Sequence, residues 1–221
     1  MEKTAILQSI LNHRILVAAR GLQTEEVLPF CEALIAGGIR CLEIPYNQRS
    51  ASVLTDVPRQ IETIRAHFGE QLLTGAGTVL NRDQAKAAAD AGASFILSPS
   101  LDAEVVKETL RQNLVSVPGV MTPTEAQNAI LCGADMVKIF PTGVLGISYL
   151  RAIRVPLNHI PMLAMGGANE ENLKEFLQVC EGVGIGNAIC NRALLDAKNY
   201  AEIARRARAF SDQAKALSDP Q

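Results

Sequence analysis

The sequence predicts an α/β fold, a single (β/α)8 barrel of the TIM type that spans residues 1–221 and carries an extra N-terminal helix. Three observations support this fold class. Eight short apolar runs alternate with segments that have the apolar spacing of amphipathic helices. The alternation fills about 200 residues without a linker, as eight strand–helix repeats would. A doubly wound open sheet is the alternative, and the absence of G-x-G-x-x-G after the first run disfavours it.

The eight apolar runs are the predicted barrel strands. Most are followed by glycine, proline or polar residues, which is typical of buried parallel strands that end in turns. In chain order they are residues 14–19, 41–45, 72–76, 95–98, 115–117, 136–140, 162–165 and 183–185.

Helices are predicted between and outside these strands. Residues 1–12 form the extra helix before the barrel, and residues 196–217 form the last helix. Residues 24–36 carry apolar side chains at helical spacing. Asn81 begins another helix, and the Thr-Pro-Thr-Glu of residues 122–125 combines a capping box with proline at the first helical position.

The composition narrows the classes of function. With 48% hydrophobic and 20% charged residues, the chain can form a sizeable core. Its net charge of −2 and the lack of a basic block give no support for nucleic-acid binding. No apolar stretch is long enough to span a bilayer, and the N-terminus lacks the pattern of a signal peptide. We therefore expect a cytoplasmic protein that acts on a small molecule, with neither a nucleic-acid nor a membrane partner.

Cysteines and histidines predict neither a disulfide framework nor a metal site. The five cysteines are odd in number and include no C-x-x-C, and several lie in apolar surroundings. This pattern is typical of buried free thiols in a reducing compartment. The three histidines have no ligand spacing between them or to the cysteines. We expect no metal and no cofactor.

Lys138 is the most informative residue, because it interrupts the apolar run at 136–140. A buried ammonium must be partnered or its burial is costly. Burial also lowers the pKa of lysine, which favours the neutral amine that attacks a carbonyl carbon to form a Schiff base. The alternative is a lysine that extends from the strand end to solvent.

Strand alternation predicts which side chains point into the barrel. Val137 and Ile139 suit the layer between sheet and helices, so Lys138 faces the interior. In the second strand Leu42 and Ile44 suit the same outer layer, so Glu43 also faces inward. An inward lysine and an inward carboxylate predict a catalytic constellation. The alternative is a structural ion pair that fills the core.

Glycine-rich and polar turns follow the predicted strands. They include residues 75–78, 98–100 and 118–119, and glycines follow the seventh and eighth strands at Gly166-Gly167 and at residues 184–187. In barrels of this type the turns after the last two strands often hold a phosphate through backbone N–H groups. The alternative is that glycine only relieves crowding in tight turns.

Together these segments resemble the class I KDPG/KHG aldolase family, whose members cleave 2-keto-3-deoxy-6-phospho sugar acids. The resemblance runs from about residue 14 to residue 194 and is strongest to the branch that acts on 2-dehydro-3-deoxy-6-phosphogalactonate. The segments that carry it are Ala19-Arg20-Gly21, Leu42-Glu43-Ile44-Pro45-Tyr46-Asn47, Gly75-Ala76-Gly77-Thr78-Val79-Leu80, Pro118-Gly119, Val137-Lys138-Ile139-Phe140-Pro141 and Gly166-Gly167.

The resemblance implies a role for each catalytic residue. Lys138 forms the carbinolamine and then the Schiff base with the C2 ketone, and Glu43 moves protons through a water molecule. Thr78 contacts the pyruvate carboxylate with the backbone of its turn, and Arg20 is a further active-site cation.

The resemblance also implies binding residues. Pro118 and Phe140 are walls of the pocket, and the phosphate is held by Gly166, Gly167, Gly186 and Asn187. Members of this family are commonly homotrimers, so the resemblance implies a homotrimer here.

Three positions bear on the substrate. Asn47 and the apolar Met165 agree with the galactonate branch, whereas the gluconate branch has arginine and threonine there. Asn187 stands where the family usually has a serine that binds phosphate.

Three alternatives follow. The gluconate epimer is the second candidate substrate, and Asn187 motivates an unphosphorylated 2-keto acid such as 4-hydroxy-2-oxoglutarate. The non-enzyme alternative is a phospho-sugar-binding barrel that has lost its chemistry.

Overall fold

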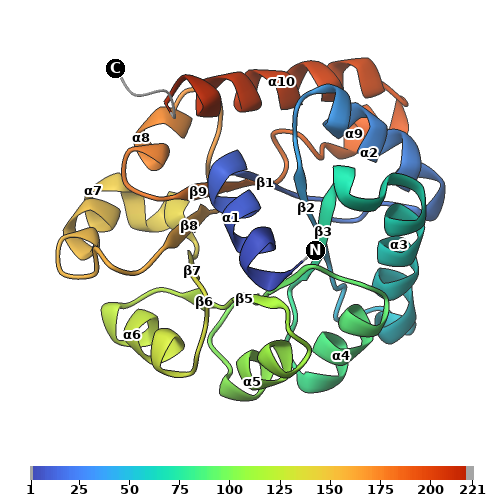
Figure 1. Cartoon of the computed structure of the whole chain (residues 1–221). Helices are drawn as coiled ribbons and strands as arrows, with labels where there is room; N and C mark the ends of the chain where they lie inside the picture. Colours follow the sequence, from blue (N-terminus) through green and yellow to red (C-terminus); the bar gives the residue numbers. More distant parts are fainter. Residues whose placement is uncertain (1, 218–221) are drawn as a thin grey trace.

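The computed structural model describes residues 2–217 and forms a nearly closed barrel of parallel strands inside a ring of helices (Figure 1). The predicted (β/α)8 barrel with an extra N-terminal helix is confirmed. In the described part of the chain the sheet order is β5-β4-β3-β2-β1-β9-β8-β7-β6. The strands are β1 (Ile15–Ala18), β2 (Cys41–Pro45), β3 (Leu73–Gly77), β4 (Phe95–Leu97), β5 (Val115–Val117), β6 (Gly119–Val120), β7 (Val137–Ile139), β8 (Met162–Met165) and β9 (Gly182–Ile185).

The fifth barrel strand is divided in two, which the sequence did not predict. β5 pairs with β4, and β6 pairs with β7. Pro118 separates them, and proline has no N–H with which to continue the ladder. Its carbonyl oxygen still accepts a hydrogen bond from Lys138 N at 2.9 Å. The chain itself therefore completes the barrel wall at Pro118.

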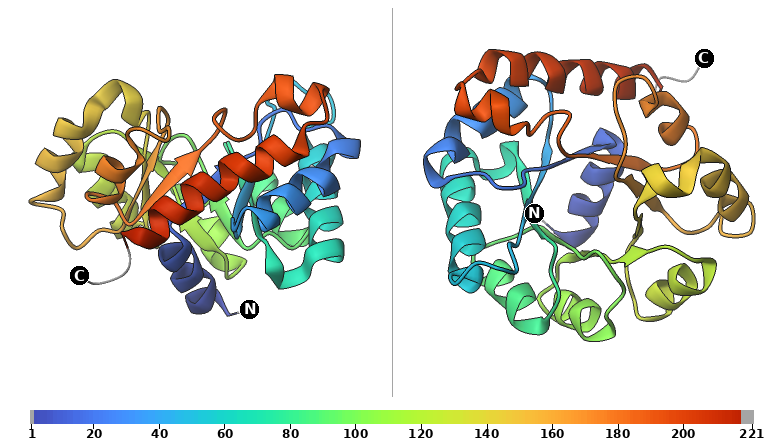
Figure 2. Two further views of the ribbon diagram at one scale, coloured as in Figure 1. Left: turned by 90° about the horizontal axis from the view of Figure 1, so that it is seen from above. Right: turned by 180° about the vertical axis from the view of Figure 1, so that it is seen from behind.

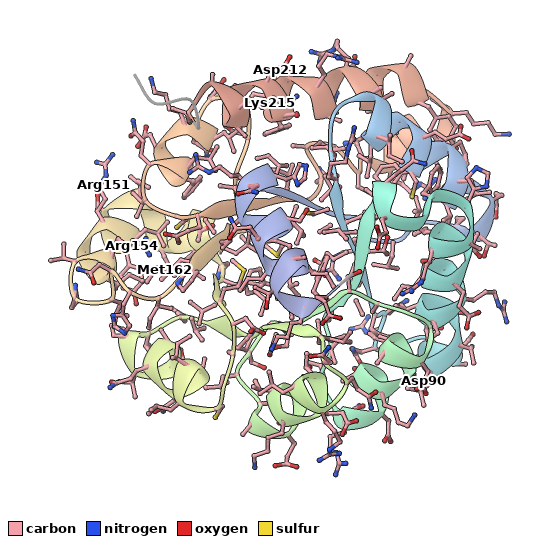
Figure 3. All side chains as sticks on the ribbon, in the orientation of Figure 1. Asp90, Arg151, Arg154, Met162, Asp212 and Lys215 are labelled. Carbon is pink, nitrogen blue, oxygen red and sulfur yellow. The ribbon has the colours of Figure 1, made fainter. Side chains whose placement is uncertain are left out.

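Helices surround the barrel on its outer side. They are α2 (Val27–Ala36), α3 (Val53–Phe68), α4 (Arg82–Asp90), α5 (Ala103–Arg111), α6 (Pro123–Leu131), α7 (Thr142–Arg154), α8 (Leu173–Leu177), α9 (Arg192–Asp196) and α10 (Tyr200–Ala216), with short 3-10 turns η1 (Thr24–Glu26) and η2 (Gly69–Gln71). Labelled charged side chains on α4, α7 and α10, such as Asp90, Arg151 and Asp212, lie on the outside of this ring (Figure 3).

Two of the predicted helix starts are confirmed in detail. The Asn81 side chain accepts a hydrogen bond from the backbone N–H of Gln84 and begins α4. Thr122 and Glu125 form both hydrogen bonds of the predicted capping box at the start of α6.

The predicted last helix begins too early at residue 196. Asp196 is the final residue of α9, and Lys198 has a left-handed φ of 51° that interrupts the helix. The Asn199 side chain then caps α10 by accepting from the N–H of Glu202 at 3.1 Å. This capping residue carried the missed signal, since asparagine is a strong N-cap.

α1 (Lys3–His13) closes one end of the barrel. It lies across the barrel end in Figure 1 and projects from the same end in the left view of Figure 2. Its buried Ile6 and Ile10 join the side chains that fill the barrel interior, which include Leu16, Cys41, Leu73, Phe95, Leu97, Val115, Val117, Met136, Leu163 and Met165. The right view of Figure 2 looks from the opposite end, where α1 does not cover the barrel.

A second, larger core fills the space between the sheet and the outer helices. It takes the side chains that point outward from the strands, among them Leu42, Ile44, Val137 and Ile139. These are the four residues that the sequence assigned to the outer layer, so the inward orientation of their neighbours follows.

Candidate active site

A cavity of about 380 Å³ lies at the barrel end opposite α1, among the carboxyl ends of the strands. Most of the predicted site residues line it, although they come from strands and turns far apart in the sequence. The lining consists of Ala18, Arg20, Glu43, Thr78, Pro99, Lys138, Phe140, Met165, Gly166, Gly167, Ala168, Gly184, Gly186, Asn187 and Ala188.

Lys138 enters the cavity from the middle of β7. Its side chain is 4% exposed, so the alternative of a lysine that extends into solvent does not hold. Its Nζ lies 4.9 Å from the centroid of the Phe140 ring, within the range of a cation–π contact. Burial lowers the pKa of Lys138, the charge of Glu43 opposes this shift, and the charge of Arg20 adds to it. The neutral, nucleophilic amine is thereby favoured.

Glu43 lies on β2 and is 2% exposed. Burial raises its pKa, while the positive charges of Lys138 and Arg20 act in the opposite direction. Its Oε2 is buried and has no hydrogen-bond partner among the described residues. A structural ion pair would satisfy that oxygen, so this observation favours a carboxyl group kept free for proton transfer.

Arg20 and Thr78 meet at one side of the cavity. Arg20 Nη2 donates to Thr78 Oγ1 at 3.4 Å. Thr78 follows β3 and has a φ of 55°, a left-handed conformation that is rare for a β-branched residue. Such a conformation costs about 1–3 kcal/mol and persists only where its surroundings enforce it, often at a functional site.

The turns after β8 and β9 form another side of the cavity. Gly166 and Gly167 have φ values of 94° and 91°, which glycine adopts without a steric penalty. The Gly166 carbonyl accepts from Gly143 N at 2.6 Å and from Thr142 Oγ1 at 2.7 Å, which fixes the turn against α7.

Backbone donors are available in these two turns. Within residues 2–217 the N–H groups of Gly167, Ala168, Asn187 and Ala188 donate no hydrogen bond. All four residues line the cavity, so this corner can offer several donors to an anion.

Two predicted site residues lie elsewhere. Asn47 is exposed, lines a neighbouring cavity of about 270 Å³, and accepts a hydrogen bond from Arg49 N at 3.1 Å. Pro118 is buried beside Lys138 in the barrel wall but is not among the residues that line the cavity. The structure therefore brings together ten of the twelve predicted residues and leaves out these two.

Five lining residues were missed by sequence reasoning. Pro99 carried a signal, because it stands in the polar turn Ser98-Pro99-Ser100 after the fourth strand. Gly184 also carried one, because it stands in the glycine-rich turn of residues 184–187 after the eighth strand. The other three are small and present mainly backbone, and their residue type gives no indication of a site: Ala18, Ala168 and Ala188.

Other cavities hold none of this chemistry. One of about 330 Å³ lies at the α1 end, and Ile6, Arg65 and Asn113 are among its lining residues. Within the described part of the chain no three His, Cys, Asp or Glu side chains converge to hold a metal ion. No described helix has the length and apolar character needed to cross a membrane.

Comparison with known proteins connects the cavity to one family. A family model described as KDPG and KHG aldolase matches residues 6–206 of this chain. The 2-dehydro-3-deoxy-6-phosphogalactonate aldolase of Escherichia coli strain K12 is 33% identical over 175 residues, which covers 78% of this chain and 82% of the relative. The 2-dehydro-3-deoxy-phosphogluconate aldolase of Treponema pallidum strain Nichols is 32% identical over 173 residues, with coverage of 78% and 79%.

The fold agrees with a solved structure of the same group. A structure described as native KDPGal has a TM-score of 0.82 and 30% sequence identity to this chain. The match covers 92% of this chain and 95% of that chain.

Proposed function

The chain belongs to the KDPG and KHG aldolase family, and we propose that it cleaves a 2-keto-3-deoxy-6-phospho sugar acid to pyruvate and D-glyceraldehyde 3-phosphate. As a member of that family it is an aldolase, a carbon–carbon lyase. The observation that carries the proposed reaction is the pair of Lys138 and Glu43, both buried and both in one cavity.

The first steps take place at Lys138. Its neutral amine attacks the C2 carbonyl carbon of the substrate to give a carbinolamine. Glu43, through a water molecule, then protonates the carbinolamine hydroxyl group, which leaves as water and yields a protonated Schiff base. The lowered pKa of Lys138 supports this role, because only the free amine carries the lone pair that attacks.

The bond-breaking step uses the Schiff base as an electron sink. When the C3–C4 bond breaks, its electron pair moves into the protonated imine and leaves an enamine. Glu43 accepts, through a water molecule, the proton that the C4 hydroxyl group releases as the aldehyde forms. It returns a proton to C3, and water then hydrolyses the pyruvate imine to regenerate the free amine. The raised pKa of Glu43 supports a carboxyl group that can both accept and return a proton.

Two groups of lining residues suit the two ends of the substrate. Thr78 and Arg20 supply a hydroxyl group and a positive charge for the carboxylate of the 2-keto acid. In the corner formed by the turns after β8 and β9, the unused N–H groups around Gly167 and Asn187 suit a phosphate. Phe140 is a wall of the cavity beside the reacting amine.

We favour 2-dehydro-3-deoxy-6-phosphogalactonate as the substrate, with its gluconate epimer second. Met165 supports this choice, since an apolar side chain in the cavity offers no hydrogen bond to a C4 hydroxyl. Asn187 supports a further candidate, an unphosphorylated acid such as 4-hydroxy-2-oxoglutarate, because its bulk reduces the room for a phosphate.

The assembly and location of the protein are part of the proposal. We propose a cytoplasmic homotrimer, in which residues 1–221 form one catalytic domain that works without metal or cofactor. The family resemblance supports the trimer, and light scattering with size-exclusion chromatography tests it. Met1 and residues 218–221 of this domain lie outside the described residues.

Borohydride trapping tests the mechanism. The protein is incubated with pyruvate, reduced with borohydride and digested, and the modified peptide is identified by mass spectrometry. We expect a reduced pyruvate adduct on Lys138. A Lys138→Met variant should give none, whereas Lys215→Met, which changes an exposed lysine of α10, should give the wild-type yield.

The same experiment separates the alternatives. Absence of the Lys138 adduct in folded wild-type protein, beside an active control aldolase, would overturn the aldolase mechanism and favour the phospho-sugar-binding barrel. If the adduct forms, pyruvate release from each of the three acids ranks the substrates.

A further inference from the structure

A glutamine pair outside the cavity contacts the backbone of Thr78, the residue with a left-handed φ of 55°. Gln48 Nε2 donates to the Thr78 carbonyl oxygen at 2.7 Å. Gln84 Nε2 donates in turn to Gln48 Oε1, also at 2.7 Å. Gln48 follows the second strand and Gln84 lies in the first turn of α4, so the pair ties two successive strand ends together.

The orientation of both amides is determined by a backbone group. The N–H of Leu80 can only donate, and it donates to Gln84 Oε1 at 2.8 Å. The NH2 of Gln84 therefore faces Gln48, whose own NH2 is then directed at Thr78. Reversing either amide would place two acceptors or two donors against each other.

Gln84, the last residue in this series of hydrogen bonds, is buried and hydrogen-bonded through its backbone as well as its side chain. It is 2% exposed. Its backbone N–H donates to Asn81 Oδ1 at 2.9 Å, and its carbonyl accepts from the hydroxyl of the buried Tyr46, also at 2.9 Å. Every polar group of Gln84 near these loops is thus used, which fixes the amide that Gln48 contacts.

The consequence for the cavity concerns the two donors of Thr78. Its carbonyl is turned toward Gln48, while its hydroxyl contacts Arg20 in the cavity. Its backbone N–H donates no hydrogen bond within residues 2–217. A threonine that relaxed to negative φ would reorient both donors, because rotation about φ and ψ moves the N–H and the side chain relative to β3.

We propose that Gln48 and Gln84 are positioning residues for the carboxylate end of the 2-keto acid, acting by holding Thr78 so that its N–H and hydroxyl face the cavity. This inference rests on the proposed function, because it assumes that Thr78 binds the carboxylate of the acid that reacts with Lys138. Gln48 does not line the cavity, so in this proposal it acts on binding only through Thr78.

The test measures, in a Gln48→Met variant, how the amount of borohydride-trapped Lys138 adduct depends on the pyruvate concentration. Methionine has a similar length and cannot donate to the Thr78 carbonyl. We expect the pyruvate concentration for half-maximal adduct to rise about fivefold or more, the factor expected for one lost hydrogen bond of ordinary strength. The adduct yield at saturating pyruvate should match that of wild type, and this yield also reports the folded fraction. Gln48→Ala provides a second variant should the first fail to fold.

Gln60→Met is the matched control. Gln60 Nε2 also donates to a backbone carbonyl, that of Leu22 at 2.9 Å, but beside the neighbouring cavity that Asn47 lines. We expect the pyruvate concentration for half-maximal adduct in this variant to stay within about twofold of wild type, because the hydrogen bond that the variant loses does not reach Thr78.

A double-mutant cycle with Thr78→Gly separates positioning from general stability. Glycine adopts positive φ without strain, so it does not need the hydrogen bond from Gln48. With glycine at position 78, Gln48→Met should change the pyruvate concentration for half-maximal adduct by less than about twofold. If Gln48 only stabilised the fold, its replacement would have the same effect with threonine or glycine at position 78.

The outcomes remain distinct from those of the proposed function. If wild-type protein forms no Lys138 adduct, the proposed function fails first. If the adduct forms and Gln48→Met leaves the pyruvate concentration for half-maximal adduct within about twofold of wild type, the positioning role is overturned. An equal effect of Gln48→Met with threonine or glycine at position 78 would overturn it as well.

Discussion

The carboxyl group of Glu43 occupies the space that a side chain at Gly77 would fill, with Glu43 Oε2 1.1 Å from the position of a Cβ atom there. In the register of β2 and β3, Glu43 lies opposite Gly75, and Gly77 is two positions further along β3 toward the barrel end that holds the cavity. Glycine at this position therefore makes room for the carboxyl group beside Lys138.

A Gly77→Ala variant should displace Glu43 while leaving Lys138 in place. We expect kcat to fall by about a hundredfold or more, as when a general acid–base group is lost. The Lys138 adduct with pyruvate should still form, since the amine is unchanged. Steady-state kinetics and borohydride trapping measure the two effects. A kcat within about threefold of wild type would show that Glu43 need not stay where it lies.

The pH dependence of trapping should reveal the charges around Lys138. Burial lowers the pKa of this amine, so the inflection of the trapping rate at saturating pyruvate should lie below pH 10.5. Glu43→Gln removes a charge that raises the pKa, so the inflection should move to lower pH. Arg20→Gln removes a charge that lowers the pKa, so the inflection should move to higher pH. Shifts in the same direction would contradict this account.

Stability should depend on pH with opposite signs at two buried glutamates. Burial raises the pKa of Glu43, so the folded state binds more protons than the unfolded state above about pH 4.5. The contribution of Glu43 to stability is therefore full below pH 4.5 and is lost as the pH rises through the folded-state pKa. Relative to wild type, the Glu43→Gln variant should have a higher free energy of unfolding, and the difference should grow as the pH rises from 4.5 through the folded-state pKa of Glu43.

Glu108→Gln is the matched comparison. A hydrogen bond from Gln112 and the charge of Arg111 lower the pKa of Glu108, so its contribution is present above pH 4.5 and is lost as the pH falls through the folded-state pKa. Urea titrations at several pH values measure both variants. The change in the free energy of unfolding caused by each substitution should rise with pH for Glu43→Gln and fall with pH for Glu108→Gln. If both changes had the same sign of slope against pH, Glu43 would not be the desolvated, unpaired carboxyl group described here.

Asn187 should govern how well a phosphate is accepted. An Asn187→Ser variant leaves more room in the corner formed by the turns after β8 and β9 and retains a donor. We expect the KM for D-glyceraldehyde 3-phosphate, in the direction of synthesis, to fall about threefold or more. The KM for unphosphorylated D-glyceraldehyde is the internal control and should not change. A higher KM for the phosphorylated aldehyde would assign the phosphate contact to Asn187 itself.

Met165 should influence the choice between substrate epimers. Its side chain fills the space above Gly184, 2.2 Å from where a Cβ atom would lie. Met165→Thr introduces a hydroxyl group that can contact a C4 hydroxyl, and we expect the ratio of kcat/KM for the gluconate over the galactonate epimer to rise about tenfold. Met165→Leu, which stays apolar, should leave the ratio within about twofold. An unchanged ratio in both variants would remove Met165 from the selection of substrate.

The sequence by itself determined which strand residues face the cavity. Side chains alternate along a strand with a period of two, so the apolar residues on either side of Lys138 and Glu43 decide their orientation locally. Helix starts at Asn81 and Thr122 were equally local, because an N-cap is recognised within four residues. The capping signal at Asn199 was also present, although the predicted last helix ran through it.

Only the tertiary structure decided how the turns meet. Asn47 and Gln48 are adjacent and both exposed, yet Gln48 donates to the carbonyl of Thr78, thirty positions along the chain, whereas the side chain of Asn47 accepts from Arg49 nearby. The division of the fifth strand at Pro118 and the fit of Glu43 over Gly77 likewise depend on neighbouring strands. Turn conformations and close contacts are set by partners distant in sequence, so no local period or propensity encodes them. The alternation of side chains does encode the inward orientation of Lys138 and Glu43, because a period of two along one strand needs no partner strand to define it.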